Sequence, residues 1–215
     1  LDATQFDLNQ KDINYEDKIK FGLKNTNFYS NTSYKGWLTN NLQLQTGVGF
    51  GYSQNAIKIA SNNINNNERA LHLKAKLKKT LTKRISISGG AEYFHTNFDE
   101  QFKSNSLSAI QYGFDNKTIA FFGESELFFS KKMALNIGIR TSKSNLVNSF
   151  PIAPRVSYAY KISNNSQISA AFGTFSQLAN SDYLKFENNL NYEKSAHYIA
   201  NYMYNKEGKM FRFET

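Results

Sequence analysis

Two glutamates offer the most direct opportunity for acid–base chemistry in this sequence. Glu124 and Glu126 lie two residues apart in a segment of alternating polarity, so both side chains extend from one face of a strand. Paired carboxylates can act as general acid and general base. Their neighbours are phenylalanines, with no histidine or nucleophile nearby. We therefore interpret them as polar side chains that line an interior, predict no catalytic residue and expect no enzyme activity.

Metal and phosphate chemistry are also weakly supported. The three histidines, His72, His95 and His197, lie at no ligand spacing from one another or from a carboxylate, and cysteine is absent. The glycine-rich segment 47–51 lacks the following helix and the Lys-Ser/Thr pair of a phosphate loop. Its alternate glycines favour strand curvature or space for something packed inside a barrel. We predict no metal site and no cofactor.

The net charge of +9 raises the question of nucleic-acid binding. The distribution of charge argues against it, because cations gather near short turns while acidic residues lie toward longer polar segments. We interpret the cations as a solvated rim and a polar interior, and expect no nucleic-acid partner. The cations near the turns are Lys78, Lys79, Lys83, Arg84, Lys131, Lys132, Lys161, Lys206 and Lys209.

The elements that position these residues are predicted to be strands. Alternation with a period of two dominates the chain, and the clearest case places three lysines, Lys74, Lys76 and Lys78, opposite a row of leucines. That lysine face must meet water. The predicted strands are Lys18–Phe28, Ser33–Leu38, Leu42–Tyr52, Leu71–Leu77, Ile85–Tyr93, Thr118–Phe129, Met133–Thr141, Ala153–Ile162, Gln167–Phe175, Ser195–Tyr204 and Lys209–Phe213.

Turn lengths alternate along the chain. Short turns are predicted at Asn40-Asn41, Thr82-Lys83, 130–132, 163–165 and 206–208. Long polar loops are predicted at Asn55–Arg69, Asn97–Asn105, Ser142–Phe150 and Gln177–Lys194, with the asparagine-rich segment 61–67 as a loop tip. Short turns at one end and long loops at the other are typical of outer-membrane barrels. We predict an all-β fold: an antiparallel up-and-down meander of about ten strands that forms part or all of a β-barrel, as one domain over residues 1–215.

Aromatic residues concentrate near the short turns. Such clusters resemble the interface girdles of membrane barrels, in which amphipathic rings lie at the headgroup level. Cross-strand aromatic pairing in a soluble sandwich is the alternative, and we favour the girdle. The residues are Trp37, Phe128, Phe129, Tyr158, Tyr160, Tyr202, Tyr204, Phe211 and Phe213.

The order of motifs in the second half of the chain suggests a family. A strand ending in Gly138-Ile139-Arg140 precedes Pro154-Arg155, and Phe172-Gly173-Thr174-Phe175 follows. Leu190-Asn191-Tyr192-Glu193-Lys194-Ser195 comes after a long segment. This series resembles the barrel of TonB-dependent outer-membrane receptors, over about Phe121 to Thr215. The usual proline after the third motif is replaced by Leu178-Ala179.

The resemblance implies a receptor in the outer membrane of a Gram-negative cell. It would capture a nutrient of the glycan, siderophore or cobalamin class on its outer loops and import it by coupling to TonB through a plug domain. The outer-membrane lipid, TonB and the plug are the implied partners. The plug and the final strands are not in this sequence, so we expect the chain to be cut from a longer precursor.

The loop 177–194 contains the candidate ligand contacts Tyr183, Phe186, Glu187 and Tyr192. Their rings could stack on a sugar or a siderophore, or could pack within a folded loop, which is the interpretation we favour.

Two other functions remain open on the sequence. A soluble ligand-binding barrel, lipocalin-like or a glycan-binding module, would direct the same apolar face inward. An outer-membrane structural or adhesion barrel would share the fold without transport. Alternation alone does not separate inward from outward apolarity. We favour the membrane interpretation, in which leucines face lipid and lysines face a wet interior.

Overall fold

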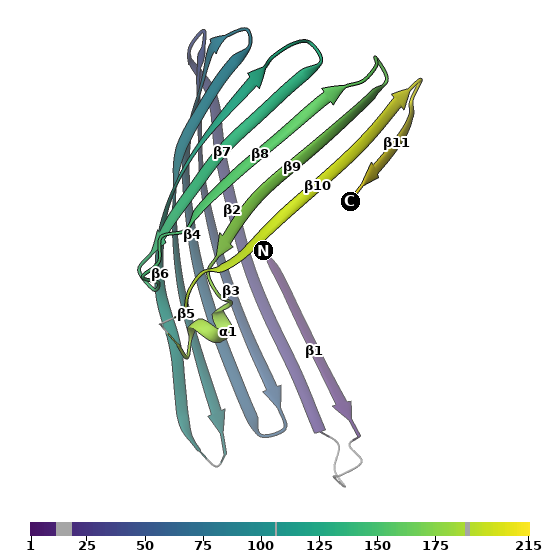
Figure 1. The fold of residues 1–215 in the computed structure, drawn as a ribbon. Helices are drawn as coiled ribbons and strands as arrows, with labels where there is room; N and C mark the ends of the chain where they lie inside the picture. Colours follow the sequence, from purple (N-terminus) through teal and green to yellow (C-terminus); the bar gives the residue numbers. More distant parts are fainter. Residues whose placement is uncertain (12–18, 106, 188–189) are drawn as a thin grey trace.

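A computed structural model shows one antiparallel sheet in which each strand pairs with its neighbours in sequence (Figure 1). The structure describes residues 1–11, 19–105, 107–187 and 190–215. The strands are β1 Asp2–Gln10, β2 Ile19–Thr39, β3 Leu42–Ile59, β4 Asn62–Thr82, β5 Ile85–Ser104, β6 Leu107–Phe128, β7 Met133–Ser144, β8 Ile152–Lys161, β9 Ser166–Gln177, β10 Glu193–Lys206 and β11 Lys209–Glu214, with a short helix, α1, over Ser181–Leu184.

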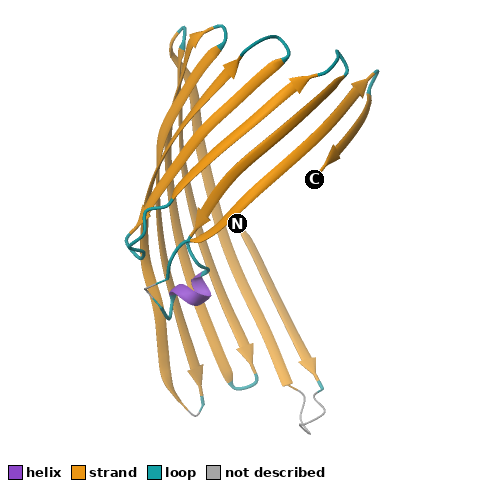
Figure 2. Cartoon of the chain, viewed as in Figure 1, coloured by secondary structure: helices purple, strands orange, loops and turns teal. Residues whose placement is uncertain are grey.

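The sheet is curled into part of a barrel. Figures 1 and 2 show β7 to β11 curving in front of β1 to β4, with α1 inside the curl. The sheet order begins at β1 and ends at β11, and no pairing within the described ranges joins these two edges. The predicted all-β antiparallel meander is thus confirmed, with eleven strands in the described residues instead of about ten.

Two predicted loops are strands instead. Asn55–Arg69 contains the end of β3, a tight turn at Ala60-Ser61 and the start of β4, so the asparagine-rich segment is no loop tip. Asn97–Asn105 lies almost entirely in β5. Both segments keep a continuous antiparallel register with their neighbours. They are polar because the sheet extends into water, and polar side chains there were mistaken for loop composition.

Other strands are also longer than predicted from the sequence. The predicted strands Lys18–Phe28 and Ser33–Leu38 are one strand, β2, although Lys18 itself lies outside the described residues. The strand β6 begins at Leu107, well before the predicted Thr118. The strand β1 was not predicted. Polar residues such as Asn25, Asn27 and Asn31 can occupy a paired strand because the backbone ladder does not depend on apolar side chains.

The other turn predictions are confirmed. The five short turns lie at one end of the sheet, and a longer loop at 145–151 connects β7 to β8 at the other end. At that same end, residues 178–187 and 190–192 lie between β9 and β10, while 188–189 of the predicted loop Gln177–Lys194 lie outside the described residues. The turn predicted at Thr82-Lys83 is centred one residue later, on Lys83-Arg84. No helix in the part of the chain that the structure describes is long and apolar enough to cross a membrane.

Apolar side chains occupy the outer face of the sheet. Leu73 is 38% exposed and Ile87 is 41% exposed, and both alternate with polar residues. Lys74 and Lys76 lie on the opposite face, where Lys74 pairs with Glu92, which is only 7% exposed. The polar face is the inner one, because α1 lies within the curl and the residue after it, Lys185, contacts Glu100 on that face. The predicted orientation is confirmed.

The outer apolar side chains form a belt that starts at the short turns. It ends abruptly partway along the strands, toward the opposite end of the sheet. In β6 it runs from Leu127 back to Ile119, and the next outer residues are Lys117 and Asp115. The neighbouring β5 changes at the same level, from Tyr93 to His95. The length is close to the roughly 9–11 residues with which a tilted strand crosses a bilayer. We call this surface the apolar belt.

Candidate functional site

The loop between β9 and β10 folds back onto the inner face of the sheet. Asn180 caps α1, because its side-chain oxygen accepts a hydrogen bond of 3.1 Å from the backbone N–H of Asp182. Leu184 at the end of the helix is buried. The cap and the buried leucine together hold the short helix against the sheet, beyond the apolar belt.

A lysine ties this loop to the sheet. The Lys185 ammonium donates hydrogen bonds of 2.8 and 3.0 Å to the two carboxylate oxygens of Glu100 in β5, and one of 3.2 Å to Asp182. Burial works to lower the pKa of Lys185, but the hydrogen bonds to Glu100 and Asp182 outweigh it and raise the pKa above the ordinary value of 10.5. The ammonium therefore stays charged and the contact persists at neutral pH.

Aromatic side chains surround this contact. The Phe186 ring packs edge-on against Tyr112 of β6 with centroids 4.6 Å apart, and Lys185 lies over the Phe186 ring at 5.1 Å. Phe98 and Phe114 stack at 5.4 Å on the same inner face. Beyond the apolar belt the inner face has thus become apolar while the outer face has become polar. This apolar inner wall consists of Phe6, Leu8, Phe21, Leu23, Ile57, Ile64, Phe98, Phe102, Tyr112 and Phe114.

The structure brings three of the four predicted contact residues together. Tyr183, Phe186 and Glu187 lie on or just after α1, and Phe186 is 63% exposed in spite of its contact with Tyr112. Tyr192 is different, because it is only 6% exposed. Tyr183 is 65% exposed, so the rings of Tyr183 and Phe186 are both accessible to solvent.

Sequence analysis missed the residues that anchor the loop. Glu100 was placed in a loop, and neither Lys185 nor Tyr112 was singled out. A signal for the wall was present, because Phe98, Glu100 and Phe102 alternate in β5 with the polar residues Asp99 and Gln101. The alternation has the same period as in the belt, but here the apolar residues lie on the inner face. The segment was predicted to be a loop because of its polar composition.

Within the level of the belt, the inner face is lined by ion pairs. Glu92 of β5 accepts from Lys74 of β4 at 2.9 Å and pairs with Arg140 of β7. Its carboxylate is also 3.8 Å from His72. Burial makes a charged carboxylate costly, and the two cationic partners Lys74 and Arg140 offset that cost.

The two glutamates that could do acid–base chemistry, Glu124 and Glu126, lie on this ion-paired inner face at the level of the belt. Glu124 accepts from Lys76 at 3.2 Å and Glu126 accepts from Lys78 at 2.6 Å, each across the intervening strand β5. Each carboxylate has its own lysine, so they act as paired polar side chains of the interior, as predicted.

The remaining candidates have structural surroundings. His72 stacks on Phe94 with centroids 4.1 Å apart, and His197 lies 4.9 Å from Phe175. His95 is 2.7 Å from Asp115 on the outer face, beyond the belt. Among the described residues, no group of three His, Cys, Asp or Glu side chains could hold a metal ion. A Cβ on Gly47 would meet only Thr32 O at 3.8 Å, so the segment 47–51 leaves open space on the inner face.

Comparison with known proteins gives a match in fold. No protein-family profile matches the sequence, and no curated protein is significantly similar. The FrpB iron transporter from Neisseria meningitidis superposes with a TM-score of 0.68 at 10% identity, over 95% of this chain and 40% of its own. The alcaligin outer-membrane receptor FauA from Bordetella pertussis gives 0.66 at 13% identity, over 89% and 35%.

The siderophore receptor PiuA from Acinetobacter baumannii gives a TM-score of 0.64 at 10% identity, over 88% of this chain and 38% of its own. The chain therefore spans about 35–40% of the length of these structures and has the fold of part of their barrels. The resemblance to TonB-dependent receptors is confirmed at the level of fold. These proteins are named as receptors and transporters.

Proposed function

We propose that this chain is part of the barrel wall of a TonB-dependent receptor in the outer membrane of a Gram-negative cell. The short turns face the periplasm, and the long strand ends and loops face the cell exterior. The proposal covers the part of the protein described here as a single barrel segment, residues 1–215. The plug domain and TonB are partners of the full-length protein.

The sidedness of the belt is the observation that carries this proposal. The outer side chains are exposed and apolar at one level of the sheet, as in Ile139, which is 53% exposed. The inner side chains at that level are charged and paired. A soluble ligand-binding barrel requires the reverse arrangement, with a dry interior and a charged exterior. A membrane barrel has hydrocarbon outside, which suits the apolar outer side chains, and water inside, which suits the charged inner side chains.

The loop between β9 and β10 and the apolar inner wall are the proposed site of nutrient capture. Tyr183 and Phe186 offer rings at the exterior end, and Glu187 adds a carboxylate beside them. The nutrient belongs to the siderophore, glycan or cobalamin class, and the names of the similar structures, which mention alcaligin, a siderophore and iron, favour the first. Import would follow from TonB acting on the plug.

Cysteine labelling tests the orientation, because this chain contains no cysteine of its own. Glu187→Cys and Lys131→Cys are introduced separately into the full-length protein. In intact cells, a maleimide that does not cross membranes should label the first variant and not the second. Both should react after the outer membrane is permeabilised. Labelling of Lys131→Cys in intact cells contradicts the proposed orientation.

Binding separates a receptor from an adhesion barrel. The purified full-length protein is titrated calorimetrically with a ferric hydroxamate siderophore, with cobalamin and with a maltooligosaccharide. We expect one of the three to bind, and Tyr183→Ala with Phe186→Ala to weaken that binding about tenfold. Accumulation of the same compound by cells should require an intact tonB gene. If all three fail to bind, the adhesion or structural barrel becomes the better explanation.

A further inference from the structure

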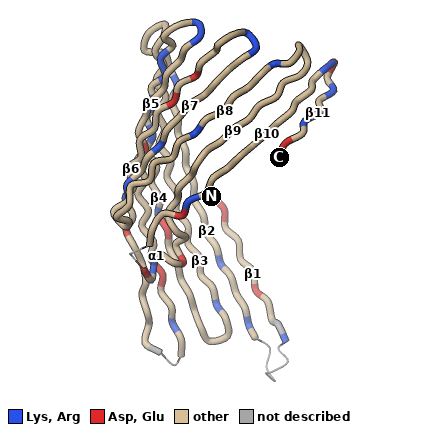
Figure 3. Tube along the Cα trace, viewed as in Figure 1, with Lys and Arg blue, Asp and Glu red and all other residues tan. Residues whose placement is uncertain are grey.

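The short-turn end of the sheet carries a concentration of exposed positive charge, visible in Figure 3. We call this set the basic rim. Its members are Lys79, Lys83, Arg84, Lys131, Lys132, Lys161 and Lys209, and each is exposed. The acidic residue in the same turns is Glu207, which lies 3.7 Å from Lys206.

The basic rim is not neutralised within the described chain. None of its seven members makes an ion pair with a described carboxylate. Glu126, the nearby carboxylate of β6, lies on the inner face and accepts from Lys78 at 2.6 Å. Like charges gathered on one edge repel one another, so an external counter-charge would stabilise this arrangement.

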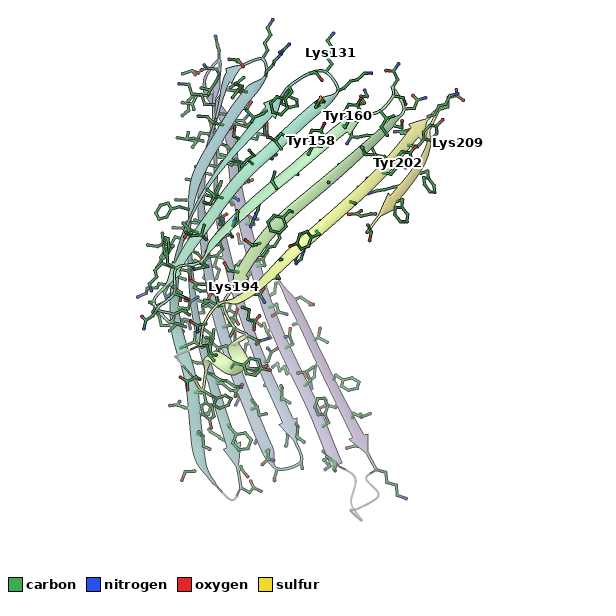
Figure 4. All side chains as sticks on the ribbon, in the orientation of Figure 1. Lys131, Tyr158, Tyr160, Lys194, Tyr202 and Lys209 are labelled. Carbon is green, nitrogen blue, oxygen red and sulfur yellow. The ribbon has the colours of Figure 1, made fainter. Side chains whose placement is uncertain are left out.

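Apolar side chains accompany these cations. Leu81, Phe129, Ile162 and Phe211 are all exposed, and each lies within two residues of a member of the basic rim. A rim that met only water would gain nothing by exposing them. Figure 4 shows Tyr158, Tyr160 and Tyr202 on the strands next to Lys131 and Lys209, where the apolar belt meets the turns. Cation, ring and aliphatic side chain thus follow one another over a few residues.

The opposite end of the sheet lacks this combination. There the outer face is mixed in charge: Asp115 lies 2.7 Å from His95 and 3.4 Å from Lys117. The exposed lysines Lys58 and Lys103 line one surface hollow together with the carboxylate of Asp7. Solubility alone explains such a surface, whereas it does not explain the basic rim.

We propose that the basic rim binds the phosphate headgroups of anionic phospholipids in the leaflet that the short turns face. This rests on the proposed function, since it places the apolar belt in a bilayer. The cations lie at the level where headgroup phosphates begin, directly beyond the belt. The accompanying leucine, isoleucine and phenylalanines enter the boundary of the acyl chains, and the tyrosines lie among the headgroups. The lipid surface is the one occupant that satisfies both kinds of side chain.

Native mass spectrometry of the purified full-length protein in nonionic detergent tests the proposal. Cardiolipin and phosphatidylcholine are titrated separately, and bound lipid is counted. Cardiolipin should bind preferentially, and the variant Lys83→Gln, Arg84→Gln, Lys131→Gln, Lys132→Gln should weaken that binding at least about tenfold. Raising the salt concentration should weaken it further in the unsubstituted protein.

The matched control removes the same number of cations from the other end of the sheet. The variant Lys20→Gln, Lys24→Gln, Lys58→Gln, Lys103→Gln has the same change in net charge, and should bind cardiolipin as the unsubstituted protein does. Equal losses in both variants would show attraction to net charge alone and overturn the proposal. Unchanged binding in the first variant would overturn it as well, and would direct attention to an acidic protein partner.

The readouts separate this proposal from the proposed function. Both variants should keep heat-dependent gel mobility, which reports a closed and stable barrel independently of lipid binding. The titration takes place in detergent and does not depend on which leaflet the turns face. A failed cysteine-labelling experiment with intact cardiolipin binding would therefore reject the orientation and keep the rim, and the reverse result would do the opposite.

Discussion

The five strands β2 to β6 and the four strands β7 to β10 differ in how far they extend beyond the apolar belt. The first group has 18 to 22 residues per strand and continues as paired sheet well beyond the belt. The second group has 10 to 14 residues per strand and ends near the belt, where the loops 145–151 and 178–192 begin. Both groups carry the belt itself.

The comparison separates what the membrane imposes from what it leaves free. Under the proposed function, every backbone polar group at the level of the belt needs a partner and every outer side chain meets hydrocarbon, so all these strands follow one pattern. Above it, water satisfies the backbone equally well in a strand or a loop. The long strands build the apolar inner wall there, and the shorter ones supply the loop that packs against it. Four predictions test this division.

The largest effect is expected at the belt. Ile137→Lys places a charge on the outer face of β7 and should lower the free energy of unfolding by about 2–4 kcal/mol. Gln111→Lys, on the outer face of β6 beyond the belt, should change it by less than about 0.5 kcal/mol. Urea unfolding of the protein from lipid vesicles measures both. Equal costs at the two positions would remove the distinction between belt and extension.

The ion pairs of the inner face come next. Glu92→Gln removes the carboxylate shared by Lys74 and Arg140 and should cost about 2 kcal/mol, because it leaves two cations with poorer partners. Glu124→Gln breaks a single, more exposed pair with Lys76 and should cost about 0.5 kcal/mol. The same unfolding measurement ranks the two. A reversed ranking would show that burial does not govern this face.

The anchor of the loop gives a local effect. Lys185→Met should make residues 178–187 about tenfold more sensitive to protease, while the unfolding midpoint stays unchanged. Asp182→Asn removes an exposed partner and serves as the control, with about a twofold change. The raised pKa of Lys185 means that the contact is complete below pH 10.5 and is lost as the pH rises through the raised value. Release of the loop in mild acid alone would contradict this account.

The smallest effect is expected on the outer face beyond the belt. The hydrogen bond from His95 lowers the pKa of the exposed Asp115 below its ordinary value of 3.8. A lowered pKa means that the contribution of this carboxylate is present above pH 3.8 and is lost as the pH falls through the lowered value. Asp115→Asn should leave the unfolding midpoint unchanged. Carbon-detected NMR of the carboxyl group follows the titration directly, and a pKa above 3.8 would contradict the arrangement.

The belt was predicted well because its residues alternate strictly between apolar and polar types. Leucines alternating with lysines in 71–78 identified the faces, and the short turns identified one end of the sheet. The extensions were missed because asparagine-rich strands such as 62–67 have the composition of a loop, and only their pairing partners in β3 and β5 reveal them as strands. The composition of a segment indicates whether its side chains meet water, whereas strand pairing depends on a second segment that the composition of the first does not identify.

The candidate site was predicted less well for a related reason. The aromatic residues of the loop were found, because Tyr183 and Phe186 lie in a polar segment where rings are conspicuous. The sheet residues that contact the loop are distant in the sequence: Glu100 binds Lys185 and Tyr112 packs on Phe186 only when the loop folds into the curl. Lys185 and Glu100 are 85 positions apart, and a contact at that separation produces no periodic pattern in a single sequence.

Within the described residues, each strand of this sheet hydrogen-bonds to the strands before and after it in the chain and to no other strand. Whole hairpins can therefore be gained or lost without breaking any other pair, which makes the circumference of the wall easy to alter during evolution. A single strand cannot be added in this way, because the chain would then arrive at the opposite end of the sheet. The number of strands in such a sheet should therefore change by two at a time, and each change keeps the outer and inner faces of the remaining strands as they were.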